Sequence, residues 1–338
     1  MRFRYFLLLP VFLSVACSDD KPLPSYDLAG NTMGTSFNIT LVDPPAELDL
    51  DQLNSAIHES LENIDFIAST WRDDSELSRF NANPSTDWIR VNPEFCRMIS
   101  AANDVSFMTQ GAFDITVGPL VNLWGFGPED QDNELPTDEE ISAAKARVGF
   151  EALETDCDHT VVRKSMPEIY VDLSGWAKGY AVDQIARLLD ARNLNNYLVE
   201  IGGELKVRGH NAKQQKFSIA IEKPLANNEM TYKLMRLSDV SVATSGDYRN
   251  FFEVDGQRFS HSIDPRTGRP INDELTGVTV VSKNTAYADA VATAFLVLGL
   301  EEGLALAERL RIAAYFLVRT DTGIEEKSSS QFELLEHE

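Results

Sequence analysis

The stretch YADAVATAF, residues 287–295, places one carboxylate and one hydroxyl in otherwise nearly apolar company. If the segment is a helix, Asp289 and Thr293 lie four residues apart and share one face. Carboxylate and hydroxyl oxygens together suit a hard cation such as Mg²⁺, which takes few protein ligands besides phosphate oxygens and water. The alternative is that Asp289 caps a helix start and Thr293 bonds back to its own helix. These residues alone leave both interpretations open.

The stretch VDLSGWAKGY, residues 171–180, has the pattern of a strand, a turn and a helix. Asp172 ends the strand-like run, and Lys178 stands at the beginning of the helix. A helix N-terminus and a lysine both attract anions, so this junction suits a phosphate group. The alternative is a structural junction whose lysine is solvated.

Two further stretches carry groups that can bind or react. The segment 111–127, GAFDITVGPLVNLWGFG, is rich in glycine and aromatic residues around Asp114, which suits the framing of a flat ring or simply a packed core loop. The segment 261–271, HSIDPRTGRPI, carries turn signals and begins with His261. A histidine can serve as a general acid or base near neutral pH, although a structural role is the alternative.

The elements that must position these groups alternate irregularly between helix and strand. Apolar residues recur at three and four from Asp49 to Ala68, which predicts an amphipathic helix. A capping box at Thr137 predicts a helix through Val148, and a third helix is expected over 177–192. Strands are expected over 35–42, 197–209, 216–224 and 278–281, and a helix followed by a strand over 304–318. We predict an α+β fold rather than a doubly wound sheet, and the sequence has no Rossmann glycine motif.

The N-terminus and the charge limit where the protein works and what it binds. Residues 1–17 resemble a bacterial lipoprotein signal peptide that ends at a lipidated Cys17, although Ser14 stands where a bulky aliphatic residue is usual. A cleaved signal peptide or an uncleaved anchor is the alternative. We expect a polar tether over 18–30 and a single domain over 31–338. The net charge of -23 argues against a nucleic acid partner. The remaining cysteines, Cys96 and Cys157, can pair in an oxidising compartment.

Taken together, the motifs resemble one family, the ApbE-like FAD:protein FMN transferases, also called flavin transferases. Each motif is weak alone, but eight of them follow in the expected order over about residues 31–299. They are NTMGTSF (31–37), STWRDDSELSRFN (69–81), GAFDITVGPLVNLWGFG (111–127), VDLSGWAKGYAVD (171–183), LVEIGGELKVRG (198–209), VATSGDYRNFF (242–252), HSIDPRTGRPI (261–271) and ADAVATAFLVLG (288–299).

The resemblance implies an α+β architecture with mixed or antiparallel sheets flanked by helices, related to the T-fold. It implies Mg²⁺-dependent transfer of FMN from FAD to a threonine hydroxyl of an acceptor protein, with release of AMP. Acceptors in the family are membrane-bound flavoprotein subunits of redox or ion-pumping complexes. An exported, membrane-anchored lipoprotein that faces the periplasm agrees with the N-terminal pattern.

Carried over residue by residue, the family's sites fall on twelve positions. The metal ligands are the Gly175 carbonyl, Asp289 and Thr293; the flavin contacts are Met33, Trp71, Ala112, Phe113, Asp114, Asp172, Lys178 and Ile263; and His261 is catalytic. Departures from the family pattern stand at Ile115, Ser174 and Trp176, within the flavin and metal loops.

The chemistry of these residues agrees with the implied reaction. Phosphoryl transfer depends mainly on positioning and charge neutralisation, which Mg²⁺ and Lys178 would supply. Either His261 or Asp289 could take the hydroxyl proton, and we favour His261. Two other functions use the same site, a Mg²⁺-dependent FAD pyrophosphatase and a non-catalytic flavin-binding lipoprotein.

Overall fold

The computed structural model describes residues 21–128, 135–224, 230–246, 251–254, 257–271 and 274–336, so the predicted signal peptide lies outside the described residues. An antiparallel sheet forms the centre of the fold, and each neighbouring pair of its strands runs in opposite directions. This arrangement confirms the predicted α+β class. In spatial order the eight strands are β1 (Ser25–Thr32), β2 (Thr35–Val42), β6 (Tyr197–Ile201), β7 (Glu204–Arg208), β10 (Val240–Gly246), β15 (Leu275–Ser282), β16 (Ala313–Thr320) and β17 (Gly323–Ser328).

Strand β1 corrects one boundary of the sequence prediction. Residues 25–30, which we expected in the polar tether, pair with β2 in a continuous register from Ser25 opposite Val42 to Thr32 opposite Thr35. β1 is an edge strand whose side chains are mostly exposed. Its backbone supplies the pairing, so the strand needs no apolar side chains and its polar sequence resembles a linker.

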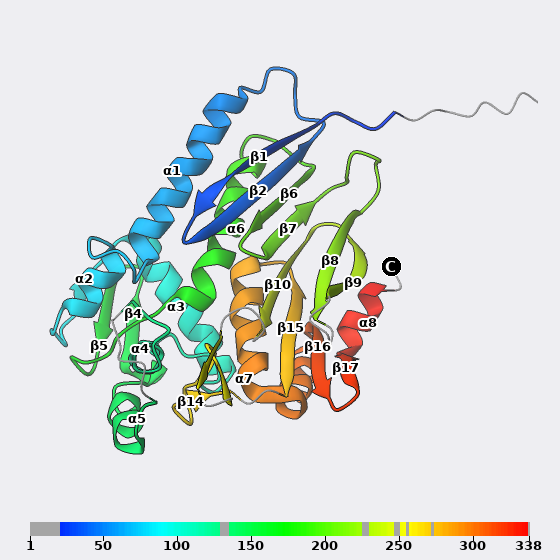
Figure 1. The fold of residues 1–338 in the computed structure, drawn as a ribbon. Helices are drawn as coiled ribbons and strands as arrows, with labels where there is room; N and C mark the ends of the chain where they lie inside the picture. Colours follow the sequence, from blue (N-terminus) through cyan, green and yellow to red (C-terminus); the bar gives the residue numbers. More distant parts are fainter. Residues whose placement is uncertain are drawn as a thin grey trace, which may run out of the picture.

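Three helices cover one face of the main sheet (Figure 1): α1 (Leu50–Ala68), α6 (Ser174–Asp190) and α7 (Thr285–Leu310). The predicted amphipathic helix is confirmed as α1, and the Asp49 side chain caps it by accepting from the Gln52 N–H at 2.9 Å. Alternation along β2 sends Phe37, Ile39 and Leu41 into the core beneath these helices. The helices and the sheet therefore enclose the larger apolar core.

A hairpin and a short helix cover the opposite face (Figure 1). The hairpin consists of β8 (Phe217–Pro224) and β9 (Met230–Leu237), and the helix is α8 (Ser330–Glu336). Phe217, Ile219 and Phe332 pack there against the reverse side of the sheet. The central strands of the main sheet are thus covered on both faces, which explains why β15 is buried along nearly its whole length.

Helix α7 is apolar enough, over 26 residues, to cross a membrane by length and composition. Within its most apolar window, however, 56% of the residues are buried inside the protein. It packs between α6 and the sheet strands β10 and β15. Gly299 interrupts it with a left-handed φ of 77°, which glycine adopts without steric cost. The apolar composition of α7 is accounted for by its position in the core.

Smaller elements lie beside the helical layer, and the segment 111–127, which includes the short helix α4, belongs to this region; it is called the loop 111–127 below. The smaller elements are α2 (Glu76–Ala82), α3 (Pro93–Met108), α4 (Gly118–Leu123), α5 (Asp138–Lys145), the short helix η1 (Phe150–Ala152), the sheet of β3 (Ile89–Arg90), β5 (Val161–Lys164) and β4 (Leu153–Asp156), and the hairpins β11 (Phe251–Val254) with β12 (Gln257–Ser260) and β13 (Ile263–Asp264) with β14 (Arg269–Pro270). The predicted capping box is confirmed, since the Glu140 N–H donates to Thr137 and the Glu140 carboxylate accepts in return.

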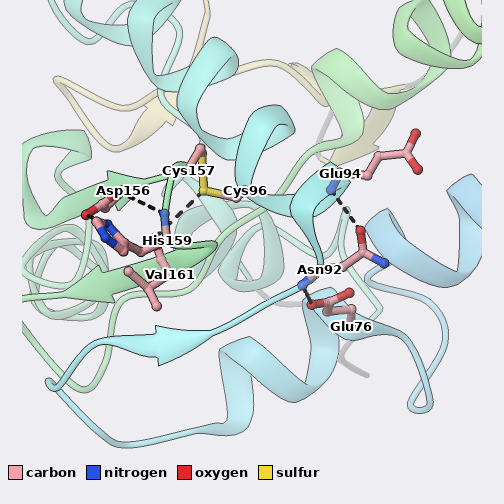
Figure 2. The surroundings of a disulfide bond; sticks show 8 residues. All are labelled: Glu76, Asn92, Glu94, Cys96, Asp156, Cys157, His159 and Val161. Atoms are coloured by element: carbon pink, nitrogen blue, oxygen red, sulfur yellow. Dashed lines mark hydrogen bonds and ion pairs between the residues drawn. A yellow bond between two sulfur atoms is a disulfide. The ribbon is translucent and has the colours of Figure 1, made fainter.

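A disulfide joins this region internally (Figure 2). Cys96 on α3 pairs with Cys157, which follows β4, across 61 residues of sequence. The pairing that the sequence left open is therefore present. The closed loop contains the whole segment 111–127, so the disulfide holds both ends of the region that presents the glycine- and aromatic-rich loop.

Candidate functional site

A cavity of about 710 Å³ opens where the main sheet, α6, α7 and the loop 111–127 meet. Eleven of the twelve predicted site residues line it: Met33, Ala112, Phe113, Asp114, Asp172, Gly175, Lys178, His261, Ile263, Asp289 and Thr293. Residues as far apart in sequence as Met33 and Thr293 thus share one site. Trp71 is the exception, because it does not line the cavity and its side chain is 71% exposed.

Asp289 and Thr293 lie on the face of α7 that meets the cavity. Helix α7 begins at Thr285 with Asn284 as its cap, so the alternative that Asp289 caps a helix start is wrong. The Asp289 side chain is 3% exposed, and its Oδ2 accepts from the Gly179 N–H of α6 at 3.2 Å. The Thr293 hydroxyl does bond back to its own helix, at 3.2 Å from the Asp289 carbonyl oxygen, and also bonds to the Ser245 hydroxyl at 3.0 Å.

Gly175 interrupts the first turn of α6 beside these two side chains. Its φ and ψ of −86° and 15° are not helical. In a regular helix the Gly175 carbonyl would accept from the Gly179 N–H, which here donates to Asp289. A Cβ placed on Gly175 would lie 3.5 Å from the Thr293 hydroxyl oxygen. The backbone of Gly175 therefore reaches the same point as Asp289 and Thr293.

The close approach of α6 to α7 depends on Gly179. A Cβ at this position would lie 2.6 Å from the Thr285 carbonyl oxygen and 2.7 Å from the Ala286 Cα. Both are backbone atoms that cannot move aside as a flexible side chain could. The absence of a side chain at Gly179 thus permits its N–H to reach Asp289.

Lys178 forms an ion pair with Glu204, which is not among the predicted site residues; the Glu204 side chain is buried and the Lys178 side chain is partly exposed. The Lys178 Nζ lies 2.7 Å from Glu204 Oε1, and the Glu204 side chain is 3% exposed. The signal available in the sequence was the Gly202–Gly203 turn, which places Glu204 at the start of β7. Glu204 also lines the cavity.

The charges of this group depend on one another. Burial raises the pKa of Asp289, and Lys178 opposes that rise. Burial and the neighbouring Asp289 raise the pKa of Glu204 to about 7. Burial alone would lower the pKa of Lys178, but Asp289 and Glu204 outweigh it and the net pKa is raised. Two buried carboxyl groups thus share one ammonium group, an arrangement in which a further cation would be stabilised.

The carboxyl groups of Asp114 and Asp172 organise the walls of the cavity. Asp114 accepts from the backbone N–H and the hydroxyl of Thr116, at 2.7 and 2.6 Å, and from the Phe150 N–H at 3.2 Å. Asp172 accepts from the Ser174 N–H at 2.8 Å, at the beginning of α6. Burial raises the pKa of both carboxyl groups. Asp114 therefore fixes the turn at residues 114–116 and joins it to the backbone at Phe150.

The segment 69–81 supports the cavity wall through Asn81, although neither Asn81 nor Trp71 lines the cavity. The Asn81 amide donates to the Val171 carbonyl at 2.8 Å and accepts from the Val171 N–H at 2.8 Å. This two-bond pairing holds the backbone immediately before Asp172. The Asp172 N–H in turn donates to the Ile115 carbonyl at 2.7 Å, which ties the two cavity walls together.

His261 enters the cavity from the segment between β12 and β13. Its ring meets the Phe126 ring edge to face, with centroids 6.2 Å apart. Ile263 and Pro265 follow it along the same wall. A titratable ring thus faces a cavity that also presents a lysine, carboxylates and an apolar surface from Met33 and Phe113.

Comparison with known proteins places this fold and site in a family. The ApbE family model matches residues 33–316. The chain is 43% identical over 329 residues to the FAD:protein FMN transferase of Vibrio cholerae serotype O1, covering 97% of this chain and 98% of that protein. It is 39% identical to the FAD:protein FMN transferase of Haemophilus influenzae, covering 95% and 93% of the two chains.

Solved structures agree over nearly the whole fold. The flavin transferase ApbE from Vibrio cholerae superposes with a TM-score of 0.87 at 43% identity, over 93% of this chain and 100% of that one. The apo form of Pseudomonas stutzeri flavinyl transferase ApbE gives a TM-score of 0.86 at 38% identity, over 94% and 98%. From its sequence, its fold and the residues gathered in its cavity, the chain belongs to the ApbE family.

Proposed function

We propose that this chain transfers FMN from FAD to a threonine hydroxyl of an acceptor flavoprotein and releases AMP. The pyrophosphate P–O bond of FAD breaks, a phosphoester bond to the threonine oxygen forms, and AMP leaves. The observation that carries the proposal is the convergence of eleven predicted residues from distant segments on one cavity. The relatives are named FAD:protein FMN transferases, which supports the assignment of flavin transfer to this enzyme.

Mg²⁺ fits the donor atoms that meet at this site. We assign as ligands the Gly175 carbonyl, the Asp289 carboxylate and the Thr293 hydroxyl, all of them oxygen donors of the kind that Mg²⁺ prefers. Thr293 can give its hydrogen to the Asp289 carbonyl, which leaves hydroxyl lone pairs for a cation. Among the residues that the structure describes, the two carboxyl groups of Asp289 and Glu204 have only the Lys178 ammonium group beside them, so their remaining negative charge favours binding of the same ion. When bound, Mg²⁺ would supply charge neutralisation at the pyrophosphate oxygens.

The protein's own residues divide the remaining work. Lys178 presents its ammonium group to the phosphates from the first turns of α6. Met33, Phe113 and Ile263 offer an apolar wall for the flavin ring. His261 takes the proton of the threonine hydroxyl as general base. We favour it over Asp289 because Asp289 already accepts from Gly179 and is proposed to hold the metal.

We further propose that the enzyme acts outside the cytoplasm as a lipoprotein anchored through Cys17 to the bacterial cell membrane, facing the periplasm. The N-terminal pattern supports export. The Cys96–Cys157 disulfide supports it independently, because disulfides persist mainly in oxidising compartments. A membrane-bound flavoprotein acceptor in the same compartment would then be accessible to the cavity.

Incubation of the purified protein with FAD, MgCl₂ and a threonine-bearing flavoprotein domain tests the activity. Intact-mass measurement of that domain should show the addition of FMN with loss of water, together with equimolar AMP. AMP without the mass increase would assign a FAD pyrophosphatase, and flavin binding without either product would assign a flavin-binding lipoprotein.

Two substitutions test the assigned roles. Asp289→Asn should abolish the Mg²⁺-dependent part of turnover, and retention of that part would remove Asp289 from the metal site. His261→Ala should lower kcat by about 10²–10⁴-fold, the usual contribution of general acid–base catalysis. A loss of less than about tenfold would exclude His261 as the base.

A further inference from the structure

The Glu204 carboxylate has one oxygen in a strong contact and the other without a partner. Oε1 lies 2.7 Å from the Lys178 ammonium nitrogen. Oε2 is buried, and among the described residues it has no hydrogen-bond partner. A buried carboxylate oxygen that lacks a donor is unfavourable, and such atoms are uncommon in folded proteins. Glu204 lines the cavity, so a rotation of its carboxylate would bring Oε2 within reach of a donor on a ligand.

The turn before Glu204 fixes the carboxylate and the lysine as one unit. Gly202 and Gly203 have φ values of 62° and 109°, which allow the tight connection between β6 and β7. The Gly203 N–H donates to Glu200 Oε1 at 2.7 Å and so fixes the turn. A Cβ on Gly202 would lie 3.2 Å from the Lys178 Cδ, so the lysine side chain passes directly over the turn.

The chemistry of Oε2 restricts what it can bind. In the ionised form, which the Lys178 ammonium group favours, the Glu204 carboxylate only accepts hydrogen bonds, so Oε2 repels phosphate oxygens and requires an O–H or N–H donor. Lys178 and the proposed metal ligands mark the position of the pyrophosphate. The donors nearest to the pyrophosphate of FAD are the hydroxyls of its two sugar portions, and the acceptor threonine brings one further hydroxyl to the same place.

We propose that Glu204 is a positioning residue for the transfer reaction. Its Oε1 holds the Lys178 ammonium group at the phosphates, and its Oε2 accepts a hydrogen bond from a substrate hydroxyl. This inference rests on the proposed function and extends it to a residue outside the predicted set. The hydroxyl belongs to FAD or to the acceptor threonine, and the two sources are separated by experiment.

The first test compares Glu204→Gln with Lys206→Met. Lys206 is a matched control because it lies on the same strand and forms an ion pair with Asp183 of α6 at 3.1 Å, outside the cavity. FAD affinity is measured by flavin fluorescence titration in EDTA, and folding by thermal unfolding. An amide cannot accept at both positions, so Glu204→Gln should weaken FAD binding by about tenfold or more, the loss expected for one hydrogen bond to a charged group. Lys206→Met should leave the FAD affinity unchanged. Equal FAD affinities for the two variants and the wild type, with transfer rates also unchanged, would overturn the proposal.

The second test separates the hydroxyl contact from the effect on Lys178. In a Lys178→Met background, Glu204→Met removes an uncompensated buried carboxylate and should raise the unfolding temperature. If Oε2 binds a hydroxyl, the same change should nevertheless weaken FAD binding or lower the transfer rate. Unchanged binding and transfer in this background would exclude the hydroxyl contact.

The molecule that supplies the hydroxyl is identified by whether FAD binding or kcat/KM for the acceptor changes. Weaker FAD binding without acceptor assigns the hydroxyl to FAD. If FAD binding is unchanged but kcat/KM falls for a flavoprotein domain that the wild type modifies, the hydroxyl belongs to the threonine. If the wild-type protein binds FAD but transfers no FMN, the proposed function fails, while the binding measurements still decide the role of Glu204.

Discussion

The pairing of Asn81 with Val171 gives a sharp prediction about how the cavity is held together. Asn81→Leu removes both hydrogen bonds, each 2.8 Å long, and leaves the Val171 N–H and carbonyl groups without these partners. The Val171 side chain is fully buried. Because each orphaned buried group costs about 1–3 kcal/mol, the free energy of unfolding should fall by about 2–6 kcal/mol. FAD affinity should fall as well, since Asp172 is the next residue.

Urea unfolding followed by fluorescence measures the stability change, and flavin titration without denaturant measures the affinity. Asn81→Asp retains an acceptor for the Val171 N–H but loses the donor, so its stability should lie between those of the wild type and Asn81→Leu. Asn83→Leu serves as the control because, within the part of the chain that the structure describes, the Asn83 side chain makes only a local bond to the Ser85 N–H. A loss of less than about 1 kcal/mol in Asn81→Leu, below the cost of one orphaned group, together with unchanged FAD affinity would show that Asn81 does not support the cavity wall.

The structure also predicts the direction of the stability change for three further variants. Gly179→Ala would normally stabilise a helix by up to about 1 kcal/mol, but here the Cβ meets backbone at 2.6 Å, so the melting temperature should fall, and a rise would contradict the packing. The double variant Cys96→Ala with Cys157→Ala opens a loop of 61 residues and should lose up to about 4 kcal/mol in urea unfolding under oxidising conditions; an unchanged midpoint would argue against the bond. Burial lowers the pKa of Lys164, so between that lowered value and the ordinary 10.5 the unfolded chain binds more protons and this residue's contribution to stability rises with pH. The free energy of unfolding of Lys164→Met should therefore fall further below that of the wild type as pH rises toward 10.5, and a constant difference would contradict this.

Local patterns predicted the helices and strands that have an apolar side. The period of three and four along α1 and the capping box of α5 correspond to the observed elements, although α5 ends at Lys145 and not at Val148. The helix expected from Ala177 begins at Ser174, because Gly175 interrupts its first turn and obscures the pattern. The polar sequence of β1 predicts a tether and not a strand, because an edge strand needs no apolar face.

The residues that sequence reasoning missed act across long separations. Asn81 bonds to a residue 90 positions away, and Lys164 contacts the Asn81 carbonyl 83 positions away. Glu204 meets Lys178 only after the β6–β7 turn and α6 have packed together. Neither hydrophobic periodicity nor turn chemistry carries information about such pairs, since each side chain is an ordinary polar residue in its own segment. The positions implied by the family resemblance did converge on the cavity, since eleven of the twelve line it.

The residues that line the cavity come from nearly the whole chain, which determines when the binding site forms during folding. The lining residues extend from Met33 to Val297, and the main sheet joins β1 near the N-terminus to β17 near the C-terminus. No early portion of the chain can form the binding site alone, and pairing of such distant segments is slow. Flavin binding should therefore appear only at the last step of refolding, where it also stabilises the completed molecule by mass action. FAD fluorescence would thus report the completion of the whole domain, whereas helix signals such as circular dichroism would report α1 and its neighbours earlier.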